Sequence, residues 1–89
     1  MNKVVLVTGG SKGIGEAIVK LFASRGFNVV INYNSDKESA VNLKKEVENK
    51  YGIKALTIKC DVSIEDEVKN MIDLIINKFN KLDVVINNA

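Results

Sequence analysis

A glycine-rich segment near the N-terminus is the first place in this 89-residue sequence where residue types and spacing indicate chemistry. Residues 8–15 read T-G-G-S-K-G-I-G and follow a short apolar run. Glycines let a backbone adopt positive φ and approach a bound group closely, and a helix beginning there would offer unpaired N–H groups. The segment therefore indicates a pyrophosphate site. The alternative is a tight turn that only joins a strand to a helix.

The segment is not a Walker A loop, because Lys12 is followed by Gly13 where that loop has Ser or Thr. Two other polar segments also follow apolar runs: Asp61-Val62 and Asn87-Asn88-Ala89. In a parallel sheet the carboxyl ends of the strands meet at one edge, where ligands bind. We expect these segments to join the glycine-rich one there. The alternatives are that Asp61 favours a helix start and that the asparagines are turn residues.

Four apolar, mostly β-branched runs are expected to be the strands that position these segments. They cover residues 4–7, 29–31, 55–58 and 84–86. Continuous apolar runs of this length are typical of strands buried on both faces of a parallel sheet.

Three helices are expected between the strands, because apolar residues there recur at helical spacing. The first begins at Gly13 and ends before Gly26. The second opens with a Ser35–Glu38 capping box and runs to about Tyr51. The third opens with Ser63 and Asp66 and carries an apolar stripe to Phe79. Helices between successive strands require parallel strands joined by right-handed crossovers.

The spacing T-G-x-x-x-G-x-G, with Asp61 after the third strand and Asn87 after the fourth, resembles the short-chain dehydrogenase/reductase family. The sequences G-G-S-K-G-I-G (residues 9–15) and V-V-I-N-Y-N (residues 29–34) are most similar to the 3-oxoacyl-[acyl-carrier-protein] reductase branch. The resemblance implies a Rossmann-like doubly wound parallel sheet, order 3-2-1-4, ending after the fourth strand. Residues 1–89 would be one partial nucleotide-binding domain of an oxidoreductase that reduces a carbonyl in fatty acid biosynthesis.

The resemblance also implies roles for individual residues. Asp61 would accept a hydrogen bond from the adenine amino group, and the backbone of Val62 would flank the ring. Asn87 would line the cofactor near its ribose, and Asn88 and Ala89 would shape the floor. The motifs and the resemblance together assign cofactor binding to Thr8, Gly9, Ser11, Lys12, Gly13, Ile14, Gly15, Asn32, Tyr33, Asn34, Ser35, Cys60, Asp61, Val62, Asn87, Asn88 and Ala89.

The end of the second strand bears on the choice of cofactor. NAD-binding sites usually place Asp or Glu there on the ribose 2′-hydroxyl, about 20 residues beyond the glycine loop. Here the residue is the neutral Asn32, and Lys12 could attract a 2′-phosphate, with residues 33–35 as hydrogen-bond donors. NADP(H) is therefore favoured over NAD(H). The alternative is a solvated Lys12 and a strand-end Asn32 without a role.

Catalytic groups are not evident in the sequence. Family members carry a catalytic Ser and a Tyr-x-x-x-Lys; only Tyr33 and Lys37 match these letters, at a strand end rather than on a long helix. The chain has no histidine, and its single cysteine, Cys60, is expected to be a small packed residue. We expect the chain alone to be inactive. The alternatives are a non-enzymatic binding module that needs a second chain, or an inert fragment.

Composition excludes several classes of protein. A net charge of +2 with scattered lysines provides no basic cluster for nucleic acid or membrane surfaces, and no apolar run could cross a bilayer. One cysteine and no leader-like start favour the cytoplasm. A sheet that stops at its fourth strand would leave that strand's edge exposed, so we expect self-association.

Overall fold

The structure, a computed structural model, describes residues 2–88 and has strands and helices in strict alternation. The elements are β1 (Val4–Val7), α1 (Gly13–Ser24), β2 (Asn28–Tyr33), α2 (Lys37–Tyr51), β3 (Ala55–Lys59), α3 (Glu65–Phe79) and β4 (Val84–Ile86). The expected order of elements is confirmed.

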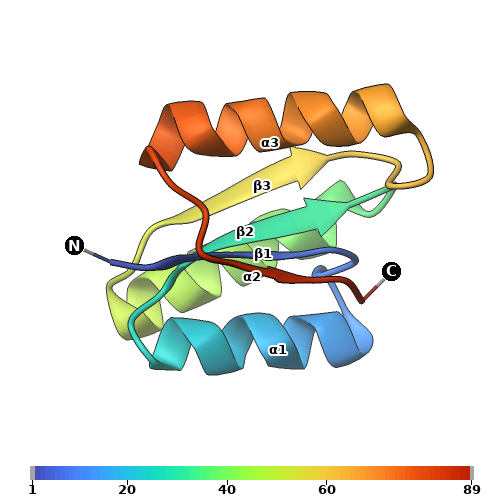
Figure 1. Cartoon of the computed structure of the whole chain (residues 1–89). Helices are drawn as coiled ribbons and strands as arrows, with labels where there is room; N and C mark the ends of the chain where they lie inside the picture. The colour runs from blue at the N-terminus through green and yellow to red at the C-terminus, as the bar shows by residue number, and fades with distance from the viewer. Residues whose placement is uncertain (1, 89) are drawn as a thin grey trace.

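The strands form one parallel sheet in the order β3-β2-β1-β4, which confirms the predicted topology. Helices α1 and α2 cover one face, and α3 covers the other (Figure 1). Strand β2 is longer than predicted, because its ladder with β3 continues to the pair Tyr33 and Lys59. Asn32 and Tyr33 are therefore part of β2 and lie in the sheet, next to the edge where the polar segments meet.

Two hydrophobic clusters form the core, one on each face of the sheet. Val5 and Val7 of β1 pack toward α1 and α2, whereas Val4 and Leu6 pack in the cluster that includes Met71 of α3. This alternation follows from the two-residue period of a strand. All four side chains of β1 are buried, as the continuous apolar run predicts.

The predicted start of α2 is wrong. The N-cap is Asp36, and its carboxylate accepts hydrogen bonds from Ser39 N (3.1 Å) and Ser39 Oγ (2.7 Å). The proposed Ser35–Glu38 box does not form, because the helix starts one residue later and Asp36 occupies the capping position. The predicted end is confirmed: α2 stops at Tyr51, and Gly52 caps it with φ of 68°.

The predicted start of α3 is also wrong. Ile64 is the N-cap residue and makes no side-chain capping bond. Ser63 bonds backwards, since its N and Oγ both donate to Asp61 Oδ1 at 3.0 and 2.6 Å. The local turn formed by Asp61 thus takes the serine that the sequence pattern assigned to the helix.

Candidate functional site

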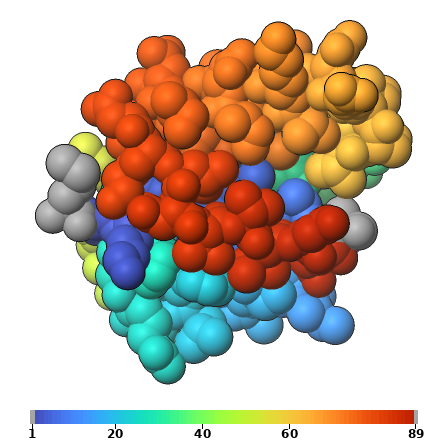
Figure 2. All heavy atoms as spheres, in the orientation of Figure 1, coloured from blue at the N-terminus to red at the C-terminus, as the bar shows by residue number. Residues whose placement is uncertain are grey.

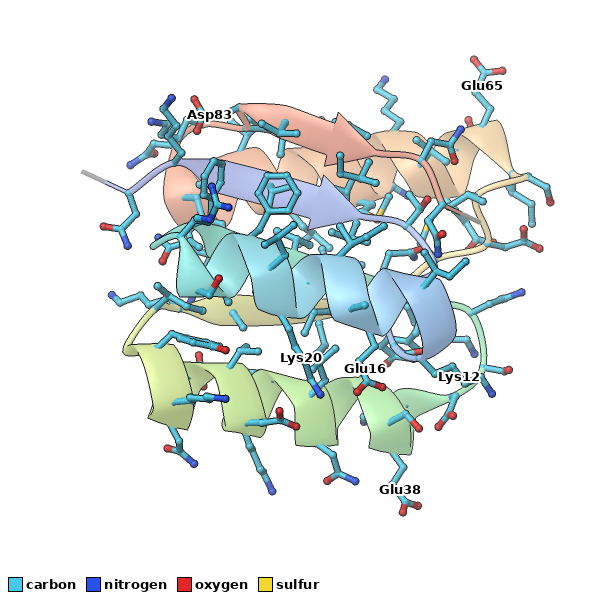
Figure 3. All side chains as sticks on the ribbon, turned by 90° about the horizontal axis from the view of Figure 1, so that it is seen from below. Lys12, Glu16, Lys20, Glu38, Glu65 and Asp83 are labelled. Atoms are coloured by element: carbon cyan, nitrogen blue, oxygen red, sulfur yellow. The ribbon has the colours of Figure 1, made fainter. Side chains whose placement is uncertain are left out.

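The segments that follow the four strands meet at the carboxyl edge of the sheet. Thr8 N donates to Ile86 O at 3.0 Å, which joins the ends of β1 and β4. Gly10 N donates to Asn32 O at 2.9 Å, and Cys60 N donates to Tyr33 O at 2.9 Å. The predicted edge therefore exists as one hydrogen-bonded unit. In Figure 3, Lys12 marks this edge and Asp83 lies at the opposite end of the sheet.

The glycine-rich loop needs its glycines for two different reasons. Gly9 and Gly13 adopt φ of 60° and 63°, a region that other residues rarely enter. Gly15 is buried in the first turn of α1, where a Cβ would overlap the carbonyl oxygen of Gly9 and come within 2.9 Å of Asn88 Nδ2. The loop is thus folded tightly back on the helix that it starts.

The peptide groups of Gly9 are held from both sides. Asn32 Oδ1 accepts the Gly9 N–H at 3.1 Å, and Asn88 Nδ2 donates to the Gly9 carbonyl oxygen at 3.3 Å. The N–H groups of Gly9 and Gly10 are therefore used within the protein. The N–H groups of residues 13–15 have no partner within α1, which begins at an extended Lys12 without a side-chain cap. An anion at this loop would meet these groups.

The chain after β4 is fastened to the loop through Thr8. Asn88 N donates to Thr8 Oγ1 at 2.9 Å, and Thr8 Oγ1 lies 3.3 Å from Asn87 Oδ1 and 3.4 Å from the Ile86 carbonyl oxygen. The predicted residues Thr8, Asn87 and Asn88 are thus brought together. Ala89, the last of the predicted site residues, lies outside the described residues.

Asn32 lies at the predicted edge, but its side chain is directed into the protein. Only 2% of the residue is exposed, and its Nδ2 donates to the carbonyl oxygens of Cys60 (3.1 Å) and Ile58 (3.4 Å). The predicted contact between this side chain and a ribose stays a prediction. In the structure, the amide forms its hydrogen bonds with backbone groups of the chain. Asn34 and Ser35, which follow it, are exposed.

Lys12 projects from the glycine loop with 73% of its side chain exposed, 3.5 Å from Asp36 (Figure 3). The hydrogen bonds from Ser39, with Lys12 beside them, lower the pKa of the Asp36 carboxyl. Asp36 was not predicted from the sequence as a neighbour of Lys12. Its signal is the D-x-x-S spacing of Asp36 and Ser39, which is typical of an N-cap.

The segment after β3 presents Asp61 and Val62 at the surface, while Cys60 is buried. The bonds from Ser63 lower the pKa of Asp61, so its carboxylate is ionised at neutral pH. Burial raises the pKa of the Cys60 thiol, which agrees with a packed residue rather than a nucleophile. Asp61 N also donates to Glu67 Oε1 at 2.9 Å, which ties the segment to α3.

A cavity of about 380 Å³ opens beside these segments and is lined by Thr8, Val62 and Asn87, with apolar side chains of α3 behind them. Its volume lies within the range of small-molecule sites. A larger groove of about 650 Å³ runs along β3 and α3 and is lined by none of the predicted cofactor residues. We place the candidate site at the smaller cavity and the glycine loop, because the polar groups converge there.

Within residues 2–88, no group of three His, Cys, Asp or Glu side chains is arranged to hold a metal ion. None of the helices in that range combines the length and apolar character needed to cross a membrane.

The sheet order and the glycine loop at its carboxyl edge define an α/β protein of the Rossmann type. The model of the short chain dehydrogenase family matches residues 3–89, and the chain belongs to that family. A 3-oxoacyl-[acyl-carrier-protein] reductase FabG of Staphylococcus epidermidis is 42% identical over all 89 residues, which correspond to 36% of that protein. The chain thus spans about a third of the length of the curated relatives that it matches.

Solved structures agree with this assignment. A short chain dehydrogenase from Burkholderia cenocepacia in complex with NADP has a TM-score of 0.93 and 39% identity over 98% of this chain and 35% of its own. An L-sorbose reductase from Gluconobacter frateurii complexed with NADPH and L-sorbose has a TM-score of 0.92 and 28% identity over 99% of this chain and 33% of its own. Both of these related proteins bind a nicotinamide dinucleotide, NADP in the first and NADPH in the second.

Proposed function

We propose that this chain supplies the NADP(H)-binding part of an oxidoreductase that reduces a carbonyl group, and that the carbonyl belongs to a 3-oxoacyl chain on acyl carrier protein. The substrate class rests on the similarity to the FabG relatives. The reaction would take place in the cytoplasm, in keeping with a single, buried cysteine that forms no disulfide.

One observation carries the preference for NADP(H). Lys12 extends from the glycine loop with 73% of its side chain exposed, and its ion-pair partner, Asp36, also accepts hydrogen bonds from Ser39. A 2′-phosphate carries more negative charge than a carboxylate and offers Lys12 a stronger charge-assisted hydrogen bond. The uncharged 2′-hydroxyl of an NAD ribose would gain less from this lysine.

Fluorescence titration of the full chain with NADPH and with NADH tests the preference. We expect NADPH to bind about tenfold more tightly, and Lys12→Gln to remove most of that difference. Lys78→Gln is the matched control, because Lys78 lines the groove along β3 and α3. Equal affinities for the two cofactors in the unaltered chain would contradict the preference, and no binding at all would favour an inert fragment.

The chain alone is proposed not to turn over substrate. Family resemblance assigns proton transfer to a Tyr-x-x-x-Lys on a long helix, and Tyr33 and Lys37 instead lie at the end of β2 and the start of α2. NADPH consumption with a 3-oxoacyl thioester should stay at the uncatalysed rate. Measurable turnover by the purified chain would overturn this part of the proposal while leaving cofactor binding intact.

Self-association through β4 is the remaining part of the proposal. Strand β4 pairs with β1 at one edge, and Val85 is 55% exposed. Figure 2 shows β4 crossing the front of the molecule between α3 and α1. Unpaired strand edges with apolar side chains favour pairing with another chain. A second copy is the proposed partner.

A further inference from the structure

Asn32 is a buried polar residue whose side-chain amide is fully used by backbone groups of other segments. It stands near the end of β2 with 2% of its surface exposed and forms contacts with segments on both sides of that strand. Toward β1, its Oδ1 accepts the N–H of Gly9 at 3.1 Å. Toward β3, its Nδ2 donates to the carbonyl oxygens of Cys60 and Ile58 at 3.1 and 3.4 Å.

These contacts use both ends of the amide in fixed roles. The oxygen must accept, because its partner is a backbone N–H, and the nitrogen must donate, because its partners are carbonyl oxygens. The backbone of Asn32 adds to the same connection, since its carbonyl oxygen accepts from Gly10 N at 2.9 Å. Among the twenty residue types, only asparagine has this length and this donor and acceptor pair.

The two segments that Asn32 joins are far apart in sequence but adjacent in the candidate site. Gly9 lies 23 residues before Asn32, and Cys60 lies 28 residues after it. Gly9 belongs to the loop proposed to receive the pyrophosphate, and Cys60 directly precedes Asp61, the residue proposed to meet the adenine. The amide therefore connects the segment proposed to receive the pyrophosphate with the segment proposed to meet the adenine.

We propose that Asn32 is a positioning residue that holds the glycine loop and the Asp61 segment at the separation a dinucleotide requires. It acts through Gly9 and Cys60 and does not itself touch the cofactor. This inference rests on the proposed cofactor site for its consequence in binding, but the connection itself is a property of the free protein. The choice between NAD(H) and NADP(H) then falls to other residues, of which Lys12 is the exposed one.

Asn32→Asp is the sharpest variant, because it keeps the size and shape of the side chain. One oxygen could still accept from Gly9 N, but the other would face the carbonyl oxygens of Cys60 and Ile58 without a hydrogen to donate. Protonation would restore that donor, and burial next to two acceptors favours the protonated form. The defect should therefore be large in mildly alkaline solution and small in acid.

Asn28→Asp is the matched control, since Asn28 begins the same strand at the other end of the sheet. Its Oδ1 accepts from Lys54 N at 2.9 Å and from Asn2 Nδ2 at 3.3 Å, and both bonds survive replacement of the amide by a carboxylate. This control separates the role of position 32 from the general effect of a carboxylate in β2.

NADP⁺ affinity of the full chain should be measured for both variants relative to the unaltered chain. For Asn32→Asp we expect a loss of about 30-fold near pH 8 that shrinks to less than about fivefold near pH 5. Asn28→Asp should change the affinity by less than about threefold at both values. A pH-independent loss in Asn32→Asp, or no loss, would overturn the proposal.

Amide hydrogen exchange provides a readout of the connection that needs no ligand. In the unaltered chain, the Gly9 N–H should exchange as slowly as the amides of β1, although Gly9 lies in a loop. In Asn32→Asp its exchange should accelerate more near pH 8 than near pH 5, after correction for intrinsic rates. Fast exchange of Gly9 in the unaltered chain would contradict the connection. Failure to bind NADP⁺ with a protected Gly9 would contradict only the proposed function.

Discussion

The carboxyl edge of the sheet and the outer side of β4 differ in how completely the chain pairs its own groups. At the carboxyl edge, Asn32, Asn88 and Thr8 supply hydrogen bonds that fix the glycine loop. On the outer side, Val85 of β4 presents more than half of its surface to solvent. The first region is the proposed site of a small ligand, and the second is the proposed site of self-association.

The two faces of the sheet also differ in the number of buried residues that pack against them. Among the residues that the structure describes, twelve buried residues pack between the sheet and the two helices α1 and α2, but only seven pack beneath α3. We infer that substitutions near the glycine loop change both stability and ligand binding. Substitutions of Val85 should change association, and they also reach the smaller cavity that this residue lines.

Gly15→Ala should have the largest effect, because its Cβ would meet the backbone of the loop rather than a flexible side chain. Overpacking of this kind lowers the free energy of unfolding by about 1–3 kcal/mol, and NADPH binding should fall with it. Gly26→Ala is the control: a Cβ there meets nothing within 4 Å, and only its φ of 85° is unfavourable. Urea unfolding and cofactor titration give the two readouts. Equal loss of cofactor affinity in both variants would show that the crowding at Gly15 is unimportant.

Val85→Lys should weaken self-association by about tenfold, because a charge on an edge strand opposes pairing. NADPH affinity is to be measured in parallel and should fall as well, because Val85 also lines the smaller cavity. Leu21→Lys is a matched control: Leu21 on α1 is 53% exposed, almost as much as Val85 at 55%. Sedimentation equilibrium measures the dimer constant. An unaltered chain that stays monomeric at high concentration would contradict association through β4.

Asp36→Asn should raise NADPH affinity by about threefold, because it frees Lys12 from its ion pair. Stability should hardly change, since Asn caps a helix about as well as Asp. NADH affinity is the internal control and should stay constant. An identical gain for both cofactors would mean that Lys12 does not read the 2′-phosphate.

Asp83 should provide the smallest effect, a dependence of stability on acid pH. The N–H of Val4 (2.8 Å), with Lys81 beside it, lowers the pKa of Asp83 from 3.8, so the folded chain binds fewer protons here than the unfolded chain. This contribution is present above pH 3.8 and is lost as the pH falls through the lower folded pKa.

Urea midpoints between about pH 2 and pH 5 should therefore fall less steeply in Asp83→Asn than in the unaltered chain. The slope should shrink without vanishing, because the pKa values of Asp36 and Asp61 are lowered as well. Parallel profiles for the two proteins would contradict the role of Asp83.

The sequence was sufficient for the elements and for the region of the site. Strands and helices were predictable because apolar periodicity is local, and the glycine loop was recognisable because its spacing is contiguous. The start of α1 at Gly13 was predicted correctly. The starts of α2 and α3 were mispredicted because Asp36, rather than Ser35, caps α2, and because Asp61 binds Ser63; loop geometry decides both. The role of Asn32 could not be predicted, since its partners lie 23 and 28 residues away.

Residue-resolved NMR with NADP⁺ tests the central claim most directly. On titration into the labelled chain, the largest amide shifts should fall on residues 11–15 of the glycine loop and on Val62, which lines the smaller cavity. The amides of residues 56–59 and 74–78, along the larger groove, should move little. Shifts concentrated along that groove, or no shifts at all, would contradict a cofactor site at the carboxyl edge of the sheet.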